Sequence, residues 1–166
     1  MASQKRTLDD LKNKSLLRTQ GLINGEWVSS SSGKSTFDVV DPATLDKLVT
    51  LPEMDAKDTA LAVDAAYAAF KDYKMTSARS RGVMLRKWSA LCHENIDDLA
   101  LILTLENGKT LTEAKGEVAY GASFLDWFAV QAEIAYGDNI PTANLNQRVV
   151  TMKQPLGVAA CLAPWK

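Results

Sequence analysis

The chain has 166 residues, 46% of them hydrophobic, which suffices for one sizeable core and is typical of a globular domain. Its 19 basic and 20 acidic residues leave a formal charge of −1, so the composition favours neither nucleic acid nor an anionic membrane as a partner. No apolar run approaches the roughly 20 residues that span a bilayer, and the first twenty residues lack the apolar core of a signal peptide. We therefore expect a cytoplasmic protein, with a mitochondrial location left open.

The first fifty residues are expected to form a small β-rich cap. Residues 1–19 are polar and have no sustained periodicity, which predicts a loose arm or a short peripheral helix. The dipeptide Asn24-Gly25 lies between apolar pairs and predicts a tight hairpin over residues 21–28, because both residues tolerate positive φ. Two further short strands are predicted over 37–40 and 47–51, separated by a turn at Asp41-Pro42.

Helical spacing begins after Asp55, a predicted N-cap, and continues through three helices. Ser77 is the predicted cap of the second helix, and Asn107-Gly108 ends the third because glycine accepts the left-handed conformation. The predicted apolar faces, in chain order, are Val63, Ala66, Tyr67 and Phe70; then Met84, Trp88 and Leu91; then Ile96, Leu99, Ala100 and Leu103.

A longer helix and two strands complete the predicted elements. Thr110 and Glu113 have the spacing of a capping box at the start of a helix expected to reach Gly137. Its predicted apolar stripe comprises Val118, Ala122, Leu125, Ala129, Ala132 and Tyr136. Residues 148–153 and 157–162 read as strands, because they are apolar or β-branched. A strand of such apolarity is normally interior to a sheet, so we expect a larger α/β fold that has been cut near residue 166.

No residue pattern in the chain predicts catalysis or metal binding. Cys92, Cys161 and the single His93 lack the spacing of a disulfide framework or a metal site, and both cysteines are predicted to be buried small hydrophobes. Asp97 and Asp98 lie early in a helix, where they favour its positive end rather than forming an acid–base pair. Phosphate-binding glycine loops are absent from the sequence.

Aromatic residues crowd the long helix, which contains Tyr120, Phe124, Trp127 and Phe128. Such a set can fill a core or line a substrate channel, and core packing is the more common role. Because Trp127 and Phe128 are adjacent, both cannot lie centrally on one helical face, so one of them is expected at a second surface such as a tunnel or another subunit.

The segment Lys153-Gln154-Pro155-Leu156-Gly157-Val158-Ala159-Ala160-Cys161-Leu162-Ala163-Pro164-Trp165 resembles the aldehyde dehydrogenase motif in which a Pro-x-Gly-Val strand leads to a Pro-Trp-Asn turn. The hairpin at 21–28, the turn Asp41-Pro42-Ala43-Thr44, Arg86-Lys87-Trp88 and residues 125–138 are similar to that family as well. The resemblance covers residues 16–165. Within the family the succinate-semialdehyde dehydrogenases are most similar, particularly in the Trp-Phe pair and the Tyr-Gly-Asp of the long helix.

The resemblance implies an α/β fold of which this chain is the amino-terminal portion. It implies a flexible arm over 1–19, part of an NAD(P)-binding domain over 20–140, a segment of an oligomerisation hairpin over 141–156 and the first core strand, truncated, over 157–166. The parts that the family uses for chemistry, a cysteine nucleophile and a glutamate base, are expected further along, so no catalytic residue is assigned in this chain.

For binding, the resemblance implies that Leu162, Ala163, Pro164 and Trp165 border NAD or NADP. The next family position is an asparagine that stabilises the oxyanion. Here it is Lys166, which cannot present an amide N–H at that point. Phe124, Trp127 and Phe128 are the candidate residues of the substrate channel. The expected partners are a small aldehyde and further copies of the chain in a dimer or tetramer.

Two functions follow as hypotheses. In the first, the chain belongs to an enzyme that oxidises an aldehyde, succinate semialdehyde before others, and is inactive alone. In the second, it is a non-catalytic interaction module or an inactive isoform that pairs with full-length subunits through exposed strands. Missing sheet strands would leave the apolar stripes around Leu99, Leu103 and Leu125 uncovered, which predicts marginal stability or aggregation.

Overall fold

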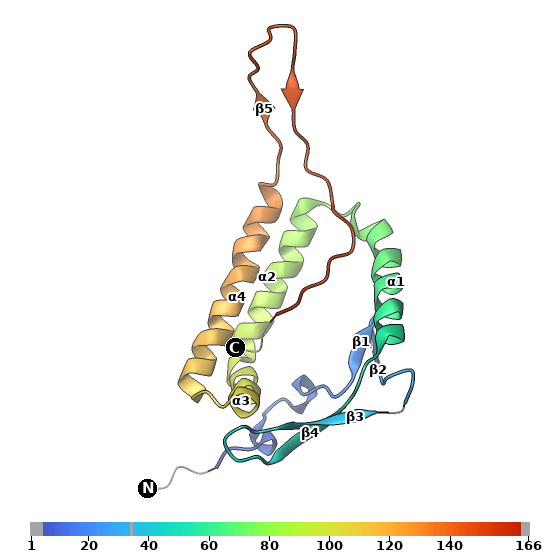
Figure 1. Cartoon of the computed structure of the whole chain (residues 1–166). Coiled ribbons are helices and arrows are strands. Elements are labelled where there is room, and N and C mark those ends of the chain that lie inside the picture. The colour runs from blue at the N-terminus through green and yellow to red at the C-terminus, as the bar shows by residue number, and fades with distance from the viewer. Residues whose placement is uncertain (1–4, 34, 164–166) are drawn as a thin grey trace.

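The computed structural model describes residues 5–33 and 35–163. These residues form two short 3-10 helices, four α-helices and three two-stranded antiparallel sheets (Figure 1). The helices are α1 (Ala56–Tyr73), α2 (Ala78–Glu94), α3 (Ile96–Asn107) and α4 (Leu111–Glu133). The strands are β1 (Gly21–Ile23), β2 (Glu26–Val28), β3 (Thr36–Val40), β4 (Lys47–Pro52), β5 (Asn139–Ile140) and β6 (Val149–Val150).

The described part of the amino-terminal arm is held against α3. The 3-10 helices Leu8–Asp10 and Lys14–Leu16 flank Leu11, which is buried with Leu101 and Leu105. The Asp98 carboxylate accepts hydrogen bonds from the backbone N–H groups of Lys12 and Asn13, at 3.0 and 2.7 Å. Of the two predicted alternatives, residues 5–19 therefore match short peripheral helices rather than a loose arm.

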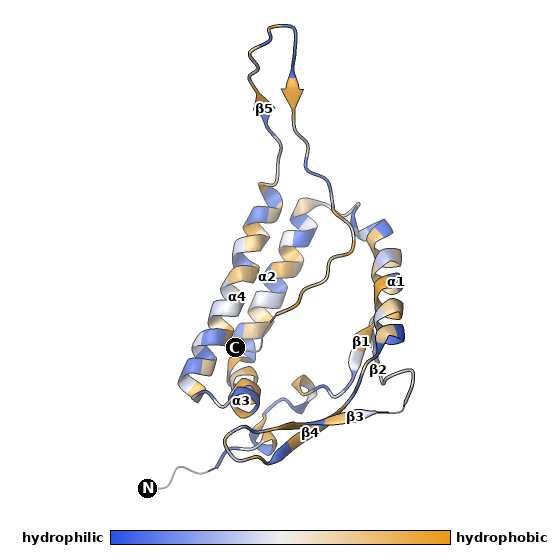
Figure 2. Ribbon diagram, in the orientation of Figure 1, coloured by the Kyte–Doolittle hydropathy of each residue, from blue (hydrophilic) through white to orange (hydrophobic). Residues whose placement is uncertain are grey.

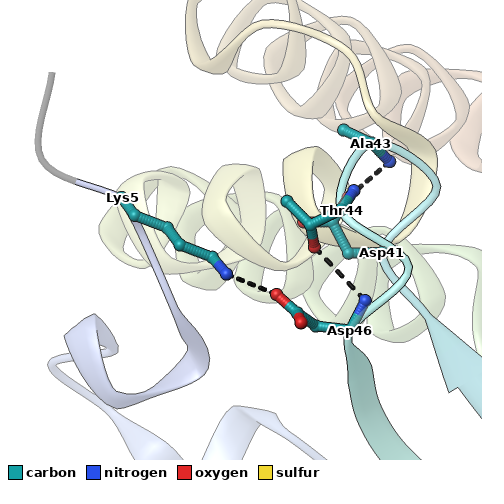
Figure 3. A network of polar contacts seen from close by, with 5 residues as sticks. All are labelled: Lys5, Asp41, Ala43, Thr44 and Asp46. Atoms are coloured by element: carbon teal, nitrogen blue, oxygen red, sulfur yellow. Dashed lines mark hydrogen bonds and ion pairs between the residues drawn. The ribbon is translucent and has the colours of Figure 1, made fainter. Parts of the chain in front are cut away.

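The hairpins of the β-rich cap form where local turn signals place them. Asn24 and Gly25 have φ of 52° and 82°, as a two-residue hairpin turn requires, and join β1 to β2. Between β3 and β4, the Asp41 carboxylate accepts the Ala43 N–H at 2.7 Å and thereby closes the turn (Figure 3). Asp46 of the same turn forms an ion pair with Lys5, which ties the amino-terminal segment to the cap.

Helix α1 begins at its predicted cap and is only partly covered. The Asp55 side chain accepts hydrogen bonds from the backbone of Lys57 and Asp58. The apolar face predicted from the spacing is present, but Val63 and Tyr67 are 49% and 59% exposed. The reason is architectural: α1 packs on β1 and stands apart from the pair formed by α2 and α4 (Figure 1).

Helices α2, α3 and α4 form the packed part of the molecule. The predicted caps are confirmed, with Ser77 bonded to the Ser80 N–H, Thr110 and Glu113 in a capping box, and Gly108 left-handed at φ 84°. Small and medium side chains make the core: Ala100, Leu103 and Ala114 in one cluster, with Ala122 and Ala129 further along α4. Leu103, expected to lack cover, is therefore buried.

Helices α2 and α4 pack closely against each other. A Cβ added to Gly82 would lie 2.8 Å from the Ala129 carbonyl oxygen, so only glycine fits there. Ser89 donates to Asp126 at 2.9 Å, and Arg86 pairs with Glu133 at 3.1 Å. The buried face of α2 thus contains Gly82 and Ser89, whereas the predicted face of Met84, Trp88 and Leu91 is exposed.

The end of the chain departs from the predicted strands. Helix α4 ends at Glu133, before Tyr136, and β5 then pairs with β6 in a hairpin that projects from the body (Figure 1). The strand predicted over 148–153 is reduced to two residues, and the strand predicted over 157–162 is absent from the described residues. An apolar run becomes a strand only when a neighbouring strand accepts its hydrogen bonds, and none lies beside residues 157–163 here.

Candidate functional site

The long helix α4 presents an exposed aromatic surface. Phe124, Trp127 and Phe128 are 45%, 62% and 56% exposed. Tyr120 contacts Phe124 edge to face, with ring centroids 4.9 Å apart and ring planes at 78°. These rings are therefore available to a ligand, to further chain or to another subunit.

The helical period explains this placement. Ala114, Ala122 and Ala129 turn one face of α4 inward, because their small side chains allow α2 and α3 to approach. Tyr120, Phe124 and Trp127, spaced at i, i+4 and i+7, then lie on the other side of the helix, with Phe128 on its flank. The more common role, core packing, is not observed for these rings. Both Trp127 and Phe128 are exposed, and the expectation that one of them lies at a second surface such as a tunnel or another subunit stays a prediction.

The predicted cofactor segment is described only in part. Leu162 is 98% exposed and Ala163 is exposed, whereas Pro164 and Trp165 lie outside the described residues. Without a sheet beside them, Leu162 and Ala163 do not form a surface that could hold a dinucleotide. The described residues of this segment, Leu162 and Ala163, therefore do not fit NAD or NADP by themselves.

The titratable groups have structural partners rather than catalytic ones. Partial burial raises the pKa of the Cys92 thiol, which opposes formation of a reactive thiolate. Cys161 is exposed, so the prediction that both cysteines are buried is wrong for Cys161, because its segment joins no sheet. Lys115 and Lys12 hold the pKa of Asp97 below its usual range, which makes this carboxylate an ion-pair partner of both lysines.

Two buried carboxylates that the sequence did not single out for these roles organise the fold. Asp98 binds the amino-terminal arm, and Asp58 accepts the Ser31 N–H at 2.9 Å and the Ser30 hydroxyl at 3.0 Å. The hydrogen bond from the Ser31 backbone, followed by that from the Asp55 backbone, lowers the pKa of Asp58 to about 2. Sequence carried no signal for either contact, because each partner lies at least 27 residues away.

Two further structural observations bear on the kind of site. Among residues 5–33 and 35–163, no group of three or more His, Cys, Asp or Glu side chains could hold a metal ion. Within the same residues, none of the helices combines the length and apolarity needed to cross a membrane.

The comparisons with known proteins assign this arrangement to one family. The aldehyde dehydrogenase family model matches residues 27–166. The chain is 45% identical over 155 residues to succinate-semialdehyde dehydrogenase [NADP(+)] GabD of Escherichia coli. This match covers 93% of the present chain and 32% of that enzyme. It is 47% identical over 156 residues to 3-sulfolactaldehyde dehydrogenase of Pseudomonas putida, covering 94% of this chain and 32% of the relative.

Solved structures agree with the sequence comparison. A crystal structure of succinate-semialdehyde dehydrogenase from Burkholderia pseudomallei superposes with a TM-score of 0.88 at 49% identity, covering 94% of this chain and 32% of that one. An NADP-dependent enzyme of E. coli gives a TM-score of 0.89 at 45% identity, with the same coverage. The chain thus spans about a third of the length of these relatives. The α/β fold class is confirmed, as an amino-terminal portion of the fold, and the chain belongs to the aldehyde dehydrogenase family.

Proposed function

We propose that this chain is part of an enzyme that oxidises an aldehyde bearing an acidic group, succinate semialdehyde before others, with NAD or NADP as the acceptor. The observation that carries the proposal is the 45% identity over 155 residues to an NADP-dependent succinate-semialdehyde dehydrogenase. Relatives with similar identity are named for glutarate semialdehyde and 3-sulfolactaldehyde. All three aldehydes carry a carboxylate or a sulfonate, so an acidic substrate is the shared feature.

Within such an enzyme, α4 would supply one wall of the substrate channel. Phe124, Trp127 and Phe128 are exposed and apolar, and they are mounted on a helix whose other face is fixed against α2 and α3. Rings on a rigid helix exclude water and position a small aldehyde without moving themselves. Leu162, Ala163, Pro164 and Trp165 would border the cofactor once their segment lies in a sheet.

The projecting hairpin of β5 and β6 would join subunits in a dimer or tetramer. Leu145 and Val150 of this hairpin are 92% and 66% exposed, as expected of a segment that packs on another chain. The domain division predicted from the sequence, with the hairpin segment at 141–156, is part of this proposal. A cytoplasmic or mitochondrial location accompanies it.

A chimera tests the proposal. The 155 matched residues of this chain replace the matched third of the E. coli relative. Oxidation of succinate semialdehyde is then compared with that of butanal, which lacks the carboxylate. We expect NADPH formation with a clear preference for succinate semialdehyde in kcat/KM. Trp127→Ala should lower kcat/KM, whereas Lys57→Ala, exposed on α1, should not. A folded chimera that binds NADP but shows no such preference contradicts the proposed substrate class.

The 166-residue chain alone should form no NADH or NADPH from any aldehyde. Its described thiols are Cys92, whose pKa is raised, and Cys161, and no described carboxylate or histidine is hydrogen-bonded to either. Aldehyde-dependent reduction of NAD or NADP by the purified chain would refute this expectation.

A second function has one observation in its favour. All three sheets of the described residues have two strands, so each leaves backbone donors and acceptors unpaired at its edges. Such edges suit an interaction module that adds to a full-length subunit. Co-purification of the tagged chain with a full-length family member would support this role, and its failure at high expression of both would exclude it.

A further inference from the structure

A cavity of about 560 Å³ opens where α1 ends, α2 begins and the segment after β6 crosses between them. Tyr73 and Lys74 contribute from the end of α1, Arg81 from the first turns of α2, and Lys153 and Gln154 from the crossing segment. Figure 1 shows this segment descending from the hairpin past α2. The volume lies within the range of small-molecule sites.

The charge of this cavity is unbalanced. Lys74, Arg81 and Lys153 line it, and no aspartate or glutamate does. None of these three cations takes part in the ion pairs of the described residues. The cavity beside the amino-terminal arm differs, because there Arg6, Lys12 and Lys115 lie among three aspartates. Uncompensated like charges around a concave surface attract anions.

The turn between α1 and α2, which carries Lys74 and precedes Arg81, is held by hydrogen bonds. The turn between α1 and α2 is closed by hydrogen bonds from the Met75 and Thr76 N–H groups to the carbonyls of Asp72 and Tyr73, each at 3.0 Å. Arg81 donates through Nη1 to the Thr76 carbonyl, so one end of its guanidinium is anchored. The remaining N–H groups of Arg81 have no partner among the described residues, and Arg81 lines the cavity.

Aromatic rings form the apolar side of the cavity. Lys74 Nζ lies over the Phe70 ring, 5.7 Å from its centroid, and both residues line the cavity. Tyr73 adds a ring and a hydroxyl. The lining therefore combines an anchored guanidinium, two ammonium groups, hydroxyl and amide donors and an apolar wall. These groups complement an oxyanion with more than one negative charge.

We propose that this cavity binds a small polyvalent oxyanion, carried by phosphate or carboxylate groups, at a site separate from the aromatic face of α4. Bound anion would bridge α1, α2 and the segment after β6. It would thereby order a segment that has no strand of its own.

The experiment titrates the full 166-residue chain with pyrophosphate or citrate at constant ionic strength and follows binding by calorimetry. We expect saturable binding of at least one of the two. Saturation by pyrophosphate alone assigns the site to phosphate groups, and saturation by citrate alone assigns it to carboxylates. Lys74→Met and Lys153→Met should each raise the Kd about fivefold, the effect of one charge at contact distance in water.

Matched variants distinguish binding in the cavity from non-specific attraction of the anion to positive charge. Lys57→Met removes an exposed charge from the other end of α1 and should leave the Kd unchanged. Arg81→Lys keeps the charge but loses the planar fork, and should weaken binding. Bound anion should also raise the temperature of unfolding, and the Lys74→Met, Lys153→Met double variant should lose that increase. Absence of saturation by both anions, or equal weakening by Lys57→Met, would overturn the proposal.

Discussion

Asp58 is the residue whose ionisation is most closely tied to local structure. Its pKa of about 2 results from hydrogen bonds donated by the Ser31 and Asp55 backbones. Because the folded pKa lies below the usual aspartate value of about 3.9, the charged carboxylate stabilises the fold. That contribution is complete above about pH 4 and is lost as the pH falls through about 2.

Replacing Asp58 by asparagine should therefore loosen the connection between the serine loop and α1. We expect faster hydrogen exchange at the Ser31 and Asp55 amides in Asp58→Asn, and exchange rates that no longer respond to this carboxylate between pH 4 and 2. Asp64→Asn is the control, since Asp64 is exposed on the same helix and has no hydrogen bond among the described residues. Equal protection of both amides in the two variants would contradict the assigned role of Asp58.

The two cysteines should differ in reactivity. Cys161 is exposed, whereas Cys92 is partly buried and its thiol pKa is raised by that burial. A thiol reagent such as DTNB should modify Cys161 first and Cys92 at least about tenfold more slowly, because the thiolate is the nucleophile. Cys161→Ser should abolish the fast phase. Slow modification of both thiols would show that residues 157–162 are covered, as the strand predicted from the sequence requires.

At the scale of elements, the contact between α2 and α4 depends on Gly82. A methyl group at this position would meet the Ala129 carbonyl oxygen at 2.8 Å, so Gly82→Ala must separate the helices. We expect the free energy of unfolding to fall by about 1–3 kcal/mol, the usual cost of overpacking. The measurement is urea denaturation followed by circular dichroism.

Gly121→Ala provides the matched control for Gly82→Ala. Gly121 lies in the interior of α4, and a Cβ there meets nothing within 4 Å. Alanine should stabilise the helix at this position by about 0.5–1 kcal/mol, because it loses less backbone entropy. If both substitutions shift the denaturation midpoint in the same direction, close approach at Gly82 does not limit the packing of α2 on α4.

The elements that could be predicted are those defined by neighbours in sequence. Asn24-Gly25 set the first hairpin, and Asp55, Ser77 and Thr110 start their helices as predicted, since each cap bonds to backbone within three residues. Long-range partners could not be predicted. Asp98 finds Lys12 across 86 residues, and the run at 157–162 remains irregular because no strand lies beside it.

In the candidate site too, features set by neighbours in sequence could be predicted and long-range contacts could not. Spacing along α4 gave the aromatic set, but the direction that Phe124, Trp127 and Phe128 face depended on which side of the helix α2 and α3 cover. The cationic cavity was beyond prediction, because Lys74, Arg81 and Lys153 come from three segments that meet only in the folded chain.

The molecule as a whole exposes more surface than a compact monomer of its mass. The accessible surface is 12667 Å² for 18.1 kDa, whereas the scaling of compact monomers with mass gives about 8,100 Å². Hydrophobic residues recur along the helices and the terminal segment in Figure 2, and Trp88, Trp127 and Leu156 are among those exposed. No large side chain of the described residues is fully buried.

This excess of exposed apolar surface predicts self-association of the isolated chain. Exposed apolar area well above a few hundred Å² is a liability in water, so the chain should bind the dye ANS and its apparent mass should rise with concentration in sedimentation experiments. The double variant Trp88→Lys, Trp127→Lys should reduce both effects without changing helix content, because both indoles are exposed. The control Lys57→Ala should leave both unchanged. A chain that stays monomeric, excludes ANS and unfolds in one cooperative thermal transition would show that these faces pack against one another in solution.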